Sequence, residues 1–235
     1  MTVLAKLKIF ATYPHECSYL DNKEATTLFV DPNATIDVDV YAKLSEVGFR
    51  RSGTHLYRPH CRSCNACVPA RIPVELFNPS RQQRRVLRRN ADLEINEVEH
   101  IKGDEYYRLY ADYIRERHRD GDMYPPSKEQ YHSFLSCEWK STRFFEFRLA
   151  GEVVIVNVLD QMSNGISAVY TFYEPNLAQR SLGAYSILWQ IEKTRSVGLP
   201  SLYLGYWIKQ CQKMSYKVQY RPIELYMNEN WVQLS

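Results

Sequence analysis

Three cysteines, each separated from the next by two residues, are the most chemically specific feature of the sequence. Cys61, Cys64 and Cys67 lie in the segment YRPHCRSCNACVPARI, among arginines and a histidine. Three thiolates on one short loop are soft metal ligands, and tetrahedral zinc or an iron–sulfur cluster usually takes a fourth ligand. The candidates for that fourth position are Cys17, His15 and His60. The competing interpretation is three free thiols in a tight loop bounded by prolines.

Cysteine usage and hydropathy limit the kinds of protein that this chain can be. The six cysteines are unevenly placed, which in a reducing compartment favours metal binding or free thiols over disulfides. Cys137 and Cys211 lie in more apolar or ordered contexts and are predicted to be packed thiols. No segment approaches the apolar length of a membrane span, and no signal peptide is recognisable at the N-terminus. We therefore expect a cytoplasmic protein.

A local cluster of positive charge follows Pro79, although the net charge of the chain is only +3. Ser80 fits the N-cap position of a helix, and no acidic residue follows until Asp92. Four of the arginines recur at helical spacing and would share one face. The five arginines are Arg81, Arg84, Arg85, Arg88 and Arg89. Such a face repels itself, so we predict that it binds the phosphates of a nucleic acid. The alternative is a solvated helix face with scattered salt bridges.

The first half of the chain is predicted to contain short strands and several helices. Short strands ending at prolines are expected over residues 26–32 and 55–60. Residues 36–49 begin with the alternation of a strand and continue with the periodicity of a helix, which is expected to end at Gly48. Residues 102–121 form a strong amphipathic pattern of tyrosines and leucine, which predicts a core-facing helix. A shorter helix is predicted over residues 131–139.

The second half changes to the periodicity of strands. Residues 144–175 predict three consecutive strands in an antiparallel meander, because tight turns are indicated at a glycine and at an Asn-Gly pair. A helix over residues 181–200 and a strand over residues 201–207 follow. This order matches the acetyltransferase-like (GNAT) arrangement, in which the N-terminal amides of such a helix receive the donor. Here that helix start is Arg180–Gly183. Ordinary α+β domains can have a similar order.

The predicted fold class is therefore α+β, with an acetyltransferase-like antiparallel sheet, flanking helices and an additional N-terminal domain that contains the cysteines. We place the boundary between residues 1–79 and residues 80–235, because the turn-rich part of the sequence ends near Pro79.

Several blocks of sequence together resemble one known family. The blocks are CSYL from Cys17, GFRRSG from Gly48, YRPHCRSCNACVP from Tyr57, SRQQRRVLRRN from Ser80, YTFYEP from Tyr170, SLGAYSILWQIE from Ser181, and YLGYWI with CQKMSYK between Tyr203 and Lys217. The set resembles the aminoacyl-tRNA–protein transferases of the arginyltransferase family, and within it the short bacterial branch that transfers leucine. The similarity extends over nearly the whole chain.

The resemblance implies an activity and a fold. It implies transfer of leucine from leucyl-tRNA to the N-terminal amine of proteins that start with Asp or Glu, which marks them for degradation by the N-degron pathway. It also implies an acetyltransferase-like catalytic region behind an N-terminal extension, and no cofactor for the transfer itself. Eukaryotic relatives carry two early cysteines and a later adjacent pair, whereas this chain has only Cys17 and the spaced triple. Metal binding is therefore not carried over intact.

The implied reaction is aminolysis of an ester, which needs no covalent enzyme intermediate. The attacking α-amine has a solution pKa of about 7.7–8.0, so part of it is neutral at physiological pH. Three tasks remain for the protein: holding the ester and the amine together, stabilising the oxyanion and moving a proton. This explains why the sequence has no G-x-S-x-G nucleophile motif.

These tasks suggest candidate residues within the resembling blocks. The acidic side chain of the acceptor needs cations, for which arginine is best suited. The candidates are Arg50, Arg51 and Arg58, with Lys213 and Lys217 as second choices. Proton carriers near the donor ester are predicted to be Tyr170, Tyr206 and Asp160. The arginines after Ser80 would hold tRNA phosphates.

Four alternatives remain open from the sequence, and one of them is a metal-dependent regulator. Arginine rather than leucine is one alternative donor. A non-catalytic RNA-binding module would explain the arginines but would leave the C-terminal blocks without a role. An acetyltransferase that uses acetyl-CoA would need a glycine-rich pyrophosphate loop, of which QRSLGAY, beginning at Gln179, is a partial match.

Overall fold

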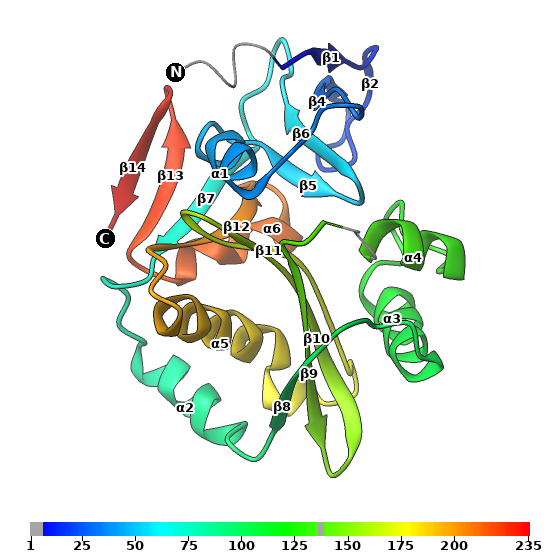
Figure 1. Cartoon of the computed structure of the whole chain (residues 1–235), viewed down its shortest axis with the longest axis vertical. Helices are drawn as coiled ribbons and strands as arrows, with labels where there is room; N and C mark the ends of the chain where they lie inside the picture. Colours follow the sequence, from blue (N-terminus) through cyan, green and yellow to red (C-terminus); the bar gives the residue numbers. More distant parts are fainter. Residues whose placement is uncertain (1–6, 136–138) are drawn as a thin grey trace.

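The computed structural model describes residues 7–135 and 139–235. Within those residues the chain forms a large eight-stranded sheet, a four-stranded sheet above it and a small two-stranded hairpin (Figure 1). The predicted α+β class is confirmed, with a mostly antiparallel large sheet and flanking helices. Among the described residues, no helix combines the length and the apolar character needed to cross a bilayer.

The N-terminal unit combines the four-stranded sheet with one helix. Its strand order is β1-β4-β6-β5, and a separate hairpin pairs β2 with β3. The elements are β1 (Ile9–Ala11), β2 (His15–Glu16), β3 (Glu24–Ala25), β4 (Thr27–Val30), α1 (Val38–Glu46), β5 (Arg50–Ser52) and β6 (His55–Pro59). The carboxylate of Asp37 caps α1 by accepting hydrogen bonds from the backbone N–H groups of Asp39 and Val40. The cysteine triple follows β6 directly.

The large sheet has the order β14-β13-β7-β12-β11-β10-β9-β8. All neighbours are antiparallel except β11 and β12, which are parallel because α5 connects them. The strands are β7 (Val68–Pro73), β8 (Glu94–Val98), β9 (Thr142–Leu149), β10 (Glu152–Met162), β11 (Gly165–Tyr173), β12 (Ser201–Trp207), β13 (Ile223–Met227) and β14 (Asn230–Leu234). The predicted meander is therefore confirmed as β9–β10–β11.

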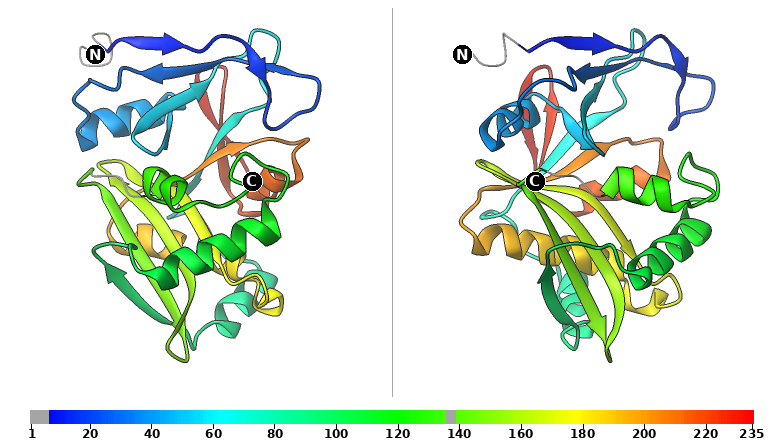
Figure 2. Two further views of the ribbon diagram at one scale, coloured as in Figure 1. Left: turned by 90° about the vertical axis from the view of Figure 1, so that its right-hand side faces the viewer. Right: turned by 45° about the vertical axis from the view of Figure 1, so that its right-hand side comes forward.

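Helices cover both faces of the large sheet (Figure 2). One apolar core joins the sheet to α5 and α2, and a second joins it to α3 and α4 on the other face. The helices and short 3-10 turns are α2 (Arg81–Arg89), α3 (Asp104–Arg117), α4 (Lys128–Leu135), η2 (Ala178–Arg180), α5 (Leu182–Ser196), α6 (Gln212–Ser215) and η3 (Tyr216–Gln219). The predicted core tyrosines of α3 are confirmed for Tyr106 and Tyr110, which are buried.

Four strands of the large sheet were not predicted from the sequence. Strand β8 and the hairpin β13–β14 lie in segments whose local pattern is mixed. Strand β7 lies within residues 1–79, yet it pairs with β12 on one side and with β13 on the other. The predicted N-terminal region therefore contributes a central strand to the sheet of the C-terminal region.

Strands β11 and β12 separate after a short paired stretch. Their pairing consists of Ile166 with Leu202 and Ser167 with Tyr203, although both strands continue beyond it. On the other side of β11, the register with β10 skips Val169, which forms a β-bulge. We call the region beyond this short paired stretch the gap between β11 and β12, and α5 begins at Leu182, after the loop and η2 that follow the end of β11 at Tyr173. The backbone groups that face this gap are not paired across it.

A buried ion pair joins the N-terminal unit to the large sheet. The side chains of Arg51 on β5 and Asp160 on β10 are 0% exposed, with Nε 2.5 Å from Oδ2 and Nη2 3.0 Å from Oδ1. The carboxylate also accepts hydrogen bonds from the hydroxyls of Tyr41, at 3.0 Å, and Thr142, at 2.7 Å. Such a fully satisfied pair fixes four elements, α1, β5, β9 and β10, in one arrangement.

We predict that Asp160→Ala lowers the free energy of unfolding by about 3–5 kcal/mol, because it leaves the Arg51 guanidinium buried without its carboxylate. Urea denaturation followed by circular dichroism measures this change. The matched control is Asp112→Ala, which removes an exposed i,i+3 pair with Arg115 and should cost less than about 0.5 kcal/mol. Equal stability of the two variants would contradict a structural role for the buried pair.

Candidate active site

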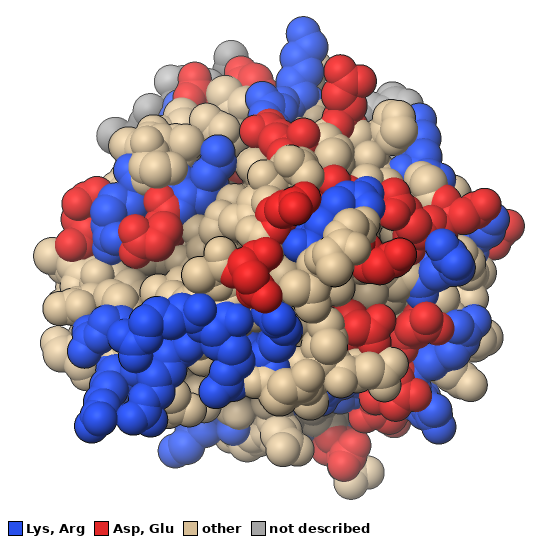
Figure 3. Space-filling model, turned by 90° about the horizontal axis from the view of Figure 1, so that it is seen from below, with Lys and Arg blue, Asp and Glu red and all other residues tan. Residues whose placement is uncertain are grey.

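The arginine segment forms the predicted helix, α2, with the predicted cap. The Ser80 hydroxyl accepts a hydrogen bond from the backbone N–H of Gln83, and the Gln83 side chain accepts one from the Ser80 backbone, which is a complete capping box. Val86 is buried against α5, while all five arginines are exposed. Among the described residues, none of the five forms an ion pair with a carboxylate. Figure 3 shows the resulting continuous basic patch on the underside of the molecule.

The end of α2 is joined to the start of α5. Asn90 donates from Nδ2 to the Arg180 carbonyl at 2.9 Å, and Arg89 donates to the carbonyl of Gln179. Arg180 in turn pairs with Asp92 at 2.8 Å. The basic face of α2 is thereby fixed beside the first turn of α5.

Tyrosines surround the first turn of α5 and the gap between β11 and β12. A Cβ atom added to Gly183 would lie only 3.0 Å from Cε1 of Tyr173, so a larger residue here would press the Tyr173 ring away from the helix start. The Tyr173 ring centroid lies 4.9 Å from that of Tyr113 on α3. Tyr216, in η3, remains 39% exposed and is close enough to Tyr173 for the charges of the two phenols to interact. Of these aromatics, only Tyr113 was predicted from periodicity to face the core.

Arg50 is a buried cation without a carboxylate partner among the described residues. It is 4% exposed, and its Nη1 donates to the carbonyls of Ser45, at 3.0 Å, and Phe49, at 2.6 Å. Its Nε and Nη2 have no hydrogen-bond acceptor in the described structure. Burial lowers the pKa of Arg50, and the nearby phenols of Tyr206 and Tyr203 oppose that shift only in part. Nε and Nη2 form the edge of a guanidinium that matches a carboxylate.

The other predicted carboxylate-binding cations differ in their surroundings. Arg51 is paired with Asp160, and Lys213 is paired with Asp120 at the surface. Arg58 donates to the Val47 carbonyl at 2.7 Å. Lys217 is only 3% exposed. Arg51 was predicted to bind the substrate carboxylate, and Asp160 was predicted to transfer a proton. In the structure the two side chains instead form an ion pair with each other.

The two predicted tyrosines lie in different surroundings. The Tyr206 hydroxyl donates to the carbonyls of Gly48, at 2.9 Å, and Tyr57, at 3.2 Å, beside Arg50. Tyr170 packs among the aromatics of the α3 and α4 face and donates to the Met123 sulfur at 3.4 Å. Burial raises the pKa of both phenols well above the ordinary value, so both remain protonated near neutral pH.

Four cysteines lie close to Cys67, and one of them, Cys211, was not among the predicted metal ligands. Burial, together with the smaller effect of the neighbouring thiols, raises the pKa of the Cys67 thiol to about 12. Those neighbours are Cys17, Cys61, Cys64 and Cys211. Cys211, predicted to be a packed thiol, lies near the predicted metal ligands. Cys137 lies outside the described residues.

The cysteine cluster does not form a metal-ligand set in this structure. Within residues 7–135 and 139–235, no three side chains of His, Cys, Asp or Glu are arranged to hold an ion. Cys61 donates to the Thr26 carbonyl at 3.8 Å, and His15 contacts the Tyr13 carbonyl at 3.1 Å.

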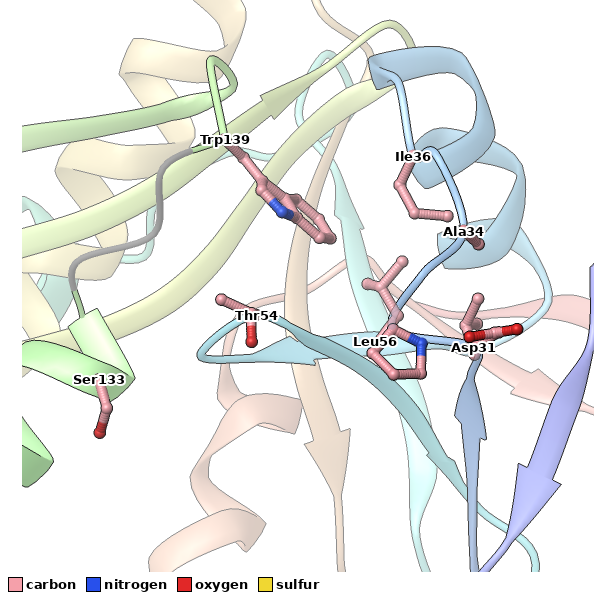
Figure 4. A pocket seen from close by; sticks show the side chains of 9 residues that line it. Asp31, Ala34, Ile36, Thr54, Leu56, Ser133 and Trp139 are labelled. Carbon is pink, nitrogen blue, oxygen red and sulfur yellow. The ribbon is translucent and has the colours of Figure 1, made fainter.

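One cavity of the described structure lies apart from these residues. It has a volume of about 490 Å³ and lies between the N-terminal unit and the end of α4 (Figure 4). Leu56, Ile36 and Trp139 provide apolar walls, and Asp31 provides the only carboxylate of its lining. None of the predicted site residues lines it.

Comparison with known proteins identifies the class and then the family. The N-terminal model of the arginine-tRNA-protein transferases matches residues 15–85, and the C-terminal model matches residues 105–227. The chain is therefore an aminoacyltransferase. It belongs to the arginine-tRNA–protein transferase family, which confirms the resemblance seen in the sequence.

The relatives match over the entire chain. Proteins named aspartate/glutamate leucyltransferase from Pseudomonas fluorescens (strain Pf0-1) and Stutzerimonas stutzeri (strain A1501) are 60% and 59% identical over 235 residues, covering 100% of both chains. A solved structure of L-PGS from Bacillus licheniformis, 12% identical, superposes with a TM-score of 0.47 and covers 71% of this chain and 49% of that chain.

We predict that Tyr206→Phe removes two buried hydrogen bonds without stopping the transfer reaction. The loss should cost about 1 kcal/mol of unfolding free energy, because the acceptor carbonyls of Gly48 and Tyr57 lose their shared donor. Denaturation and a single-turnover transfer assay measure the two effects. A fall of 100-fold or more in the rate, at unchanged stability, would instead establish Tyr206 as a proton carrier.

Proposed function

We propose that this chain transfers leucine from leucyl-tRNA to the N-terminal amine of proteins that begin with Asp or Glu. The observation that carries the proposal is the 60% identity, over the full length, to a protein named aspartate/glutamate leucyltransferase. The product would carry an N-terminal leucine and would be degraded by the N-degron pathway. The geometry of the described residues supports each part of this reaction.

The donor tRNA is proposed to lie on α2. The five arginines are exposed and not neutralised by described carboxylates, so they can bind phosphates without reading a sequence. Because α2 ends beside the first turn of α5, a 3′ end that passes α2 reaches Tyr173 and Gly183 next. Aromatic side chains there can stack on an unpaired base.

The ester is proposed to enter the gap between β11 and β12, as expected for an acetyltransferase-like sheet. Beyond Ser167 and Tyr203 the facing backbone groups of the two strands are not paired with each other. Backbone N–H groups on that edge of β11, near the bulge at Val169, can donate to the oxyanion of the tetrahedral intermediate. Donors that are already held in a strand need no reorganisation during the reaction.

The acidic side chain of the acceptor is proposed to pair with Arg50. Its Nε and Nη2 have no acceptor in the described structure, and the cation is buried without a carboxylate. A buried unpaired charge is costly, so an arriving carboxylate would compensate for a cost that the free enzyme already bears. The same pairing would favour Asp and Glu over uncharged first residues.

A metal at the cysteines remains a separate prediction. Zinc or an iron–sulfur cluster at Cys17, Cys61, Cys64 and Cys67 would require these residues to move together from their present positions. Elemental analysis of anaerobically purified protein tests this, since a resident ion gives a stoichiometric content and free thiols give none. The transfer proposed above does not depend on the result.

The proposed function is tested by transfer of labelled amino acids to peptides with varied first residues. Leucyl-tRNA and arginyl-tRNA are compared as donors, with peptides that begin with Asp, Glu, Asn or Ala. We expect leucine on the Asp and Glu peptides. Transfer of arginine and not leucine would show that arginyl-tRNA, and not leucyl-tRNA, is the donor. Binding of tRNA by folded protein without transfer to any peptide would leave only an RNA-binding module.

We predict that Arg84→Glu combined with Arg88→Glu weakens the binding of leucyl-tRNA and lowers its salt dependence. Loss of two phosphate contacts should reduce the slope of log Kd against log salt by about 1–2. The matched control is Arg115→Glu with Arg119→Glu, which reverses two exposed arginines on or just after α3. Equal effects of the two double variants would mean that net charge, and not the α2 face, governs binding.

We predict that Arg50→Met raises the KM for Asp and Glu acceptors by about 10–100-fold, since charge-assisted hydrogen bonds contribute about 1.5–3 kcal/mol. Folding stability should be kept or increased, because the substitution removes an unpaired buried cation. Arg58→Met provides a comparison with a neighbouring cation. A lowered melting temperature at unchanged KM would assign Arg50 to the fold instead of the acceptor.

A further inference from the structure

Lys217 is a buried lysine without an anionic partner in the described structure. It is 3% exposed, and its Nζ makes a single described hydrogen bond, to the Met214 sulfur at 3.4 Å. A thioether is a weak acceptor, and lysines are almost never fully buried unless they are paired. By contrast, Lys128 and Lys213 are both paired with carboxylates at the surface. The burial of Lys217 therefore calls for a functional explanation.

The groups around Lys217 favour an amine that exchanges its proton readily. Burial lowers the pKa of Lys217 to about 8, and the Cys211 thiol is the one titratable group whose charge opposes this. Nζ also lies 4.8 Å from the centroid of the Tyr216 ring. At neutral pH the side chain is therefore mostly an ammonium, yet it is far easier to deprotonate than an exposed lysine.

Lys217 is placed beside the gap that we propose for the ester. Its 3-10 turn, η3, packs against β12, the strand that has separated from β11. Tyr216 and Tyr220 of the same segment are close enough to Tyr173 for their phenols to interact electrostatically. Tyr173 in turn contacts Gly183 at the start of α5. The segment that carries the buried amine therefore packs against β12 beside this gap.

We propose that Lys217 transfers the proton that links amine attack to departure of the ribose oxygen. This inference rests on the proposed function and assigns a group to its proton transfer. The neutral α-amine attacks the ester carbon, a C–N bond forms, and the carbonyl electron pair moves onto oxygen. As the carbonyl re-forms, the C–O bond to ribose breaks, and the Lys217 ammonium gives its proton to the departing oxygen. Neutral Lys217 then takes the proton from the new amide nitrogen and is restored.

A proton-transfer role differs measurably from the carboxylate-binding role that the sequence suggested for Lys217. A ligand for the acceptor carboxylate would affect mainly the KM of Asp and Glu peptides. A group that protonates the leaving oxygen would affect the rate at saturating acceptor. The two roles also differ at alkaline pH, because only proton transfer depends on the amine giving up and regaining its proton.

The experiment is a single-turnover transfer assay from pH 6 to 10, with saturating Asp-peptide and wild-type protein, Lys217→Met, Lys217→Arg and the exposed control Lys209→Met. The wild-type rate should rise as the acceptor amine deprotonates and fall above a pH of about 8, where the Lys217 ammonium is lost. Lys217→Met should lower the rate by about 100-fold or more. Lys217→Arg should be slow and should lack the alkaline decline, because a guanidinium keeps its proton.

Three results would overturn the proposal. One is a Lys217→Met rate within 3-fold of wild type, and another is a raised acceptor KM at an unchanged saturating rate. The third is an alkaline decline that persists in Lys217→Arg. Melting temperatures check folding, and Lys217→Met should remain folded because it removes an unpaired buried charge. Absence of transfer by the wild-type protein with every charged tRNA would contradict the proposed function itself, which is a different outcome.

Discussion

The arrangement of the whole molecule depends on one buried ion pair, between Arg51 of the N-terminal unit and Asp160 of the large sheet. Tyr41 and Thr142 complete the hydrogen bonding of its carboxylate, so the charges are compensated within the core. Since Arg50 and Arg51 are adjacent on a strand, their side chains point to opposite faces. Fixing Arg51 toward Asp160 therefore directs Arg50 toward the tyrosines of β12.

Compensated and uncompensated charges divide the protein into supporting and reactive parts. Arg71 pairs with Glu46 and Glu224, and Arg148 pairs with Glu105 and Glu146, so these cations stabilise the fold. Arg50, Lys217 and the arginines of α2 have no such described partners. A tRNA, an ester and an acidic N-terminus could supply the missing negative charge. The proposed reaction is therefore consistent with where the fold leaves cations unneutralised.

The elements predicted correctly are those encoded by local sequence signals. The elements that were not predicted depend on pairing between distant parts of the chain. The Ser80 cap, the Asn-Gly turn and the meander were predicted because each is encoded within a few residues. Strand β7 was missed because its partners come from the other end of the chain. The pairing of Asp160 with Arg51 could not be recognised in the sequence, because the two residues lie 109 positions apart. Without that partner, Asp160 was predicted to move a proton. Burial of Lys217 has no local signature either.

The position of β7 has a consequence for how this protein can be divided. The strand belongs to the first third of the chain, yet it fills the space between β12 and β13 from the last third. A fragment that starts after Pro79 would expose two unpaired strand edges, which promote aggregation. The two family regions, residues 15–85 and 105–227, therefore share one sheet. Gene fusion or domain exchange at their border would interrupt that sheet.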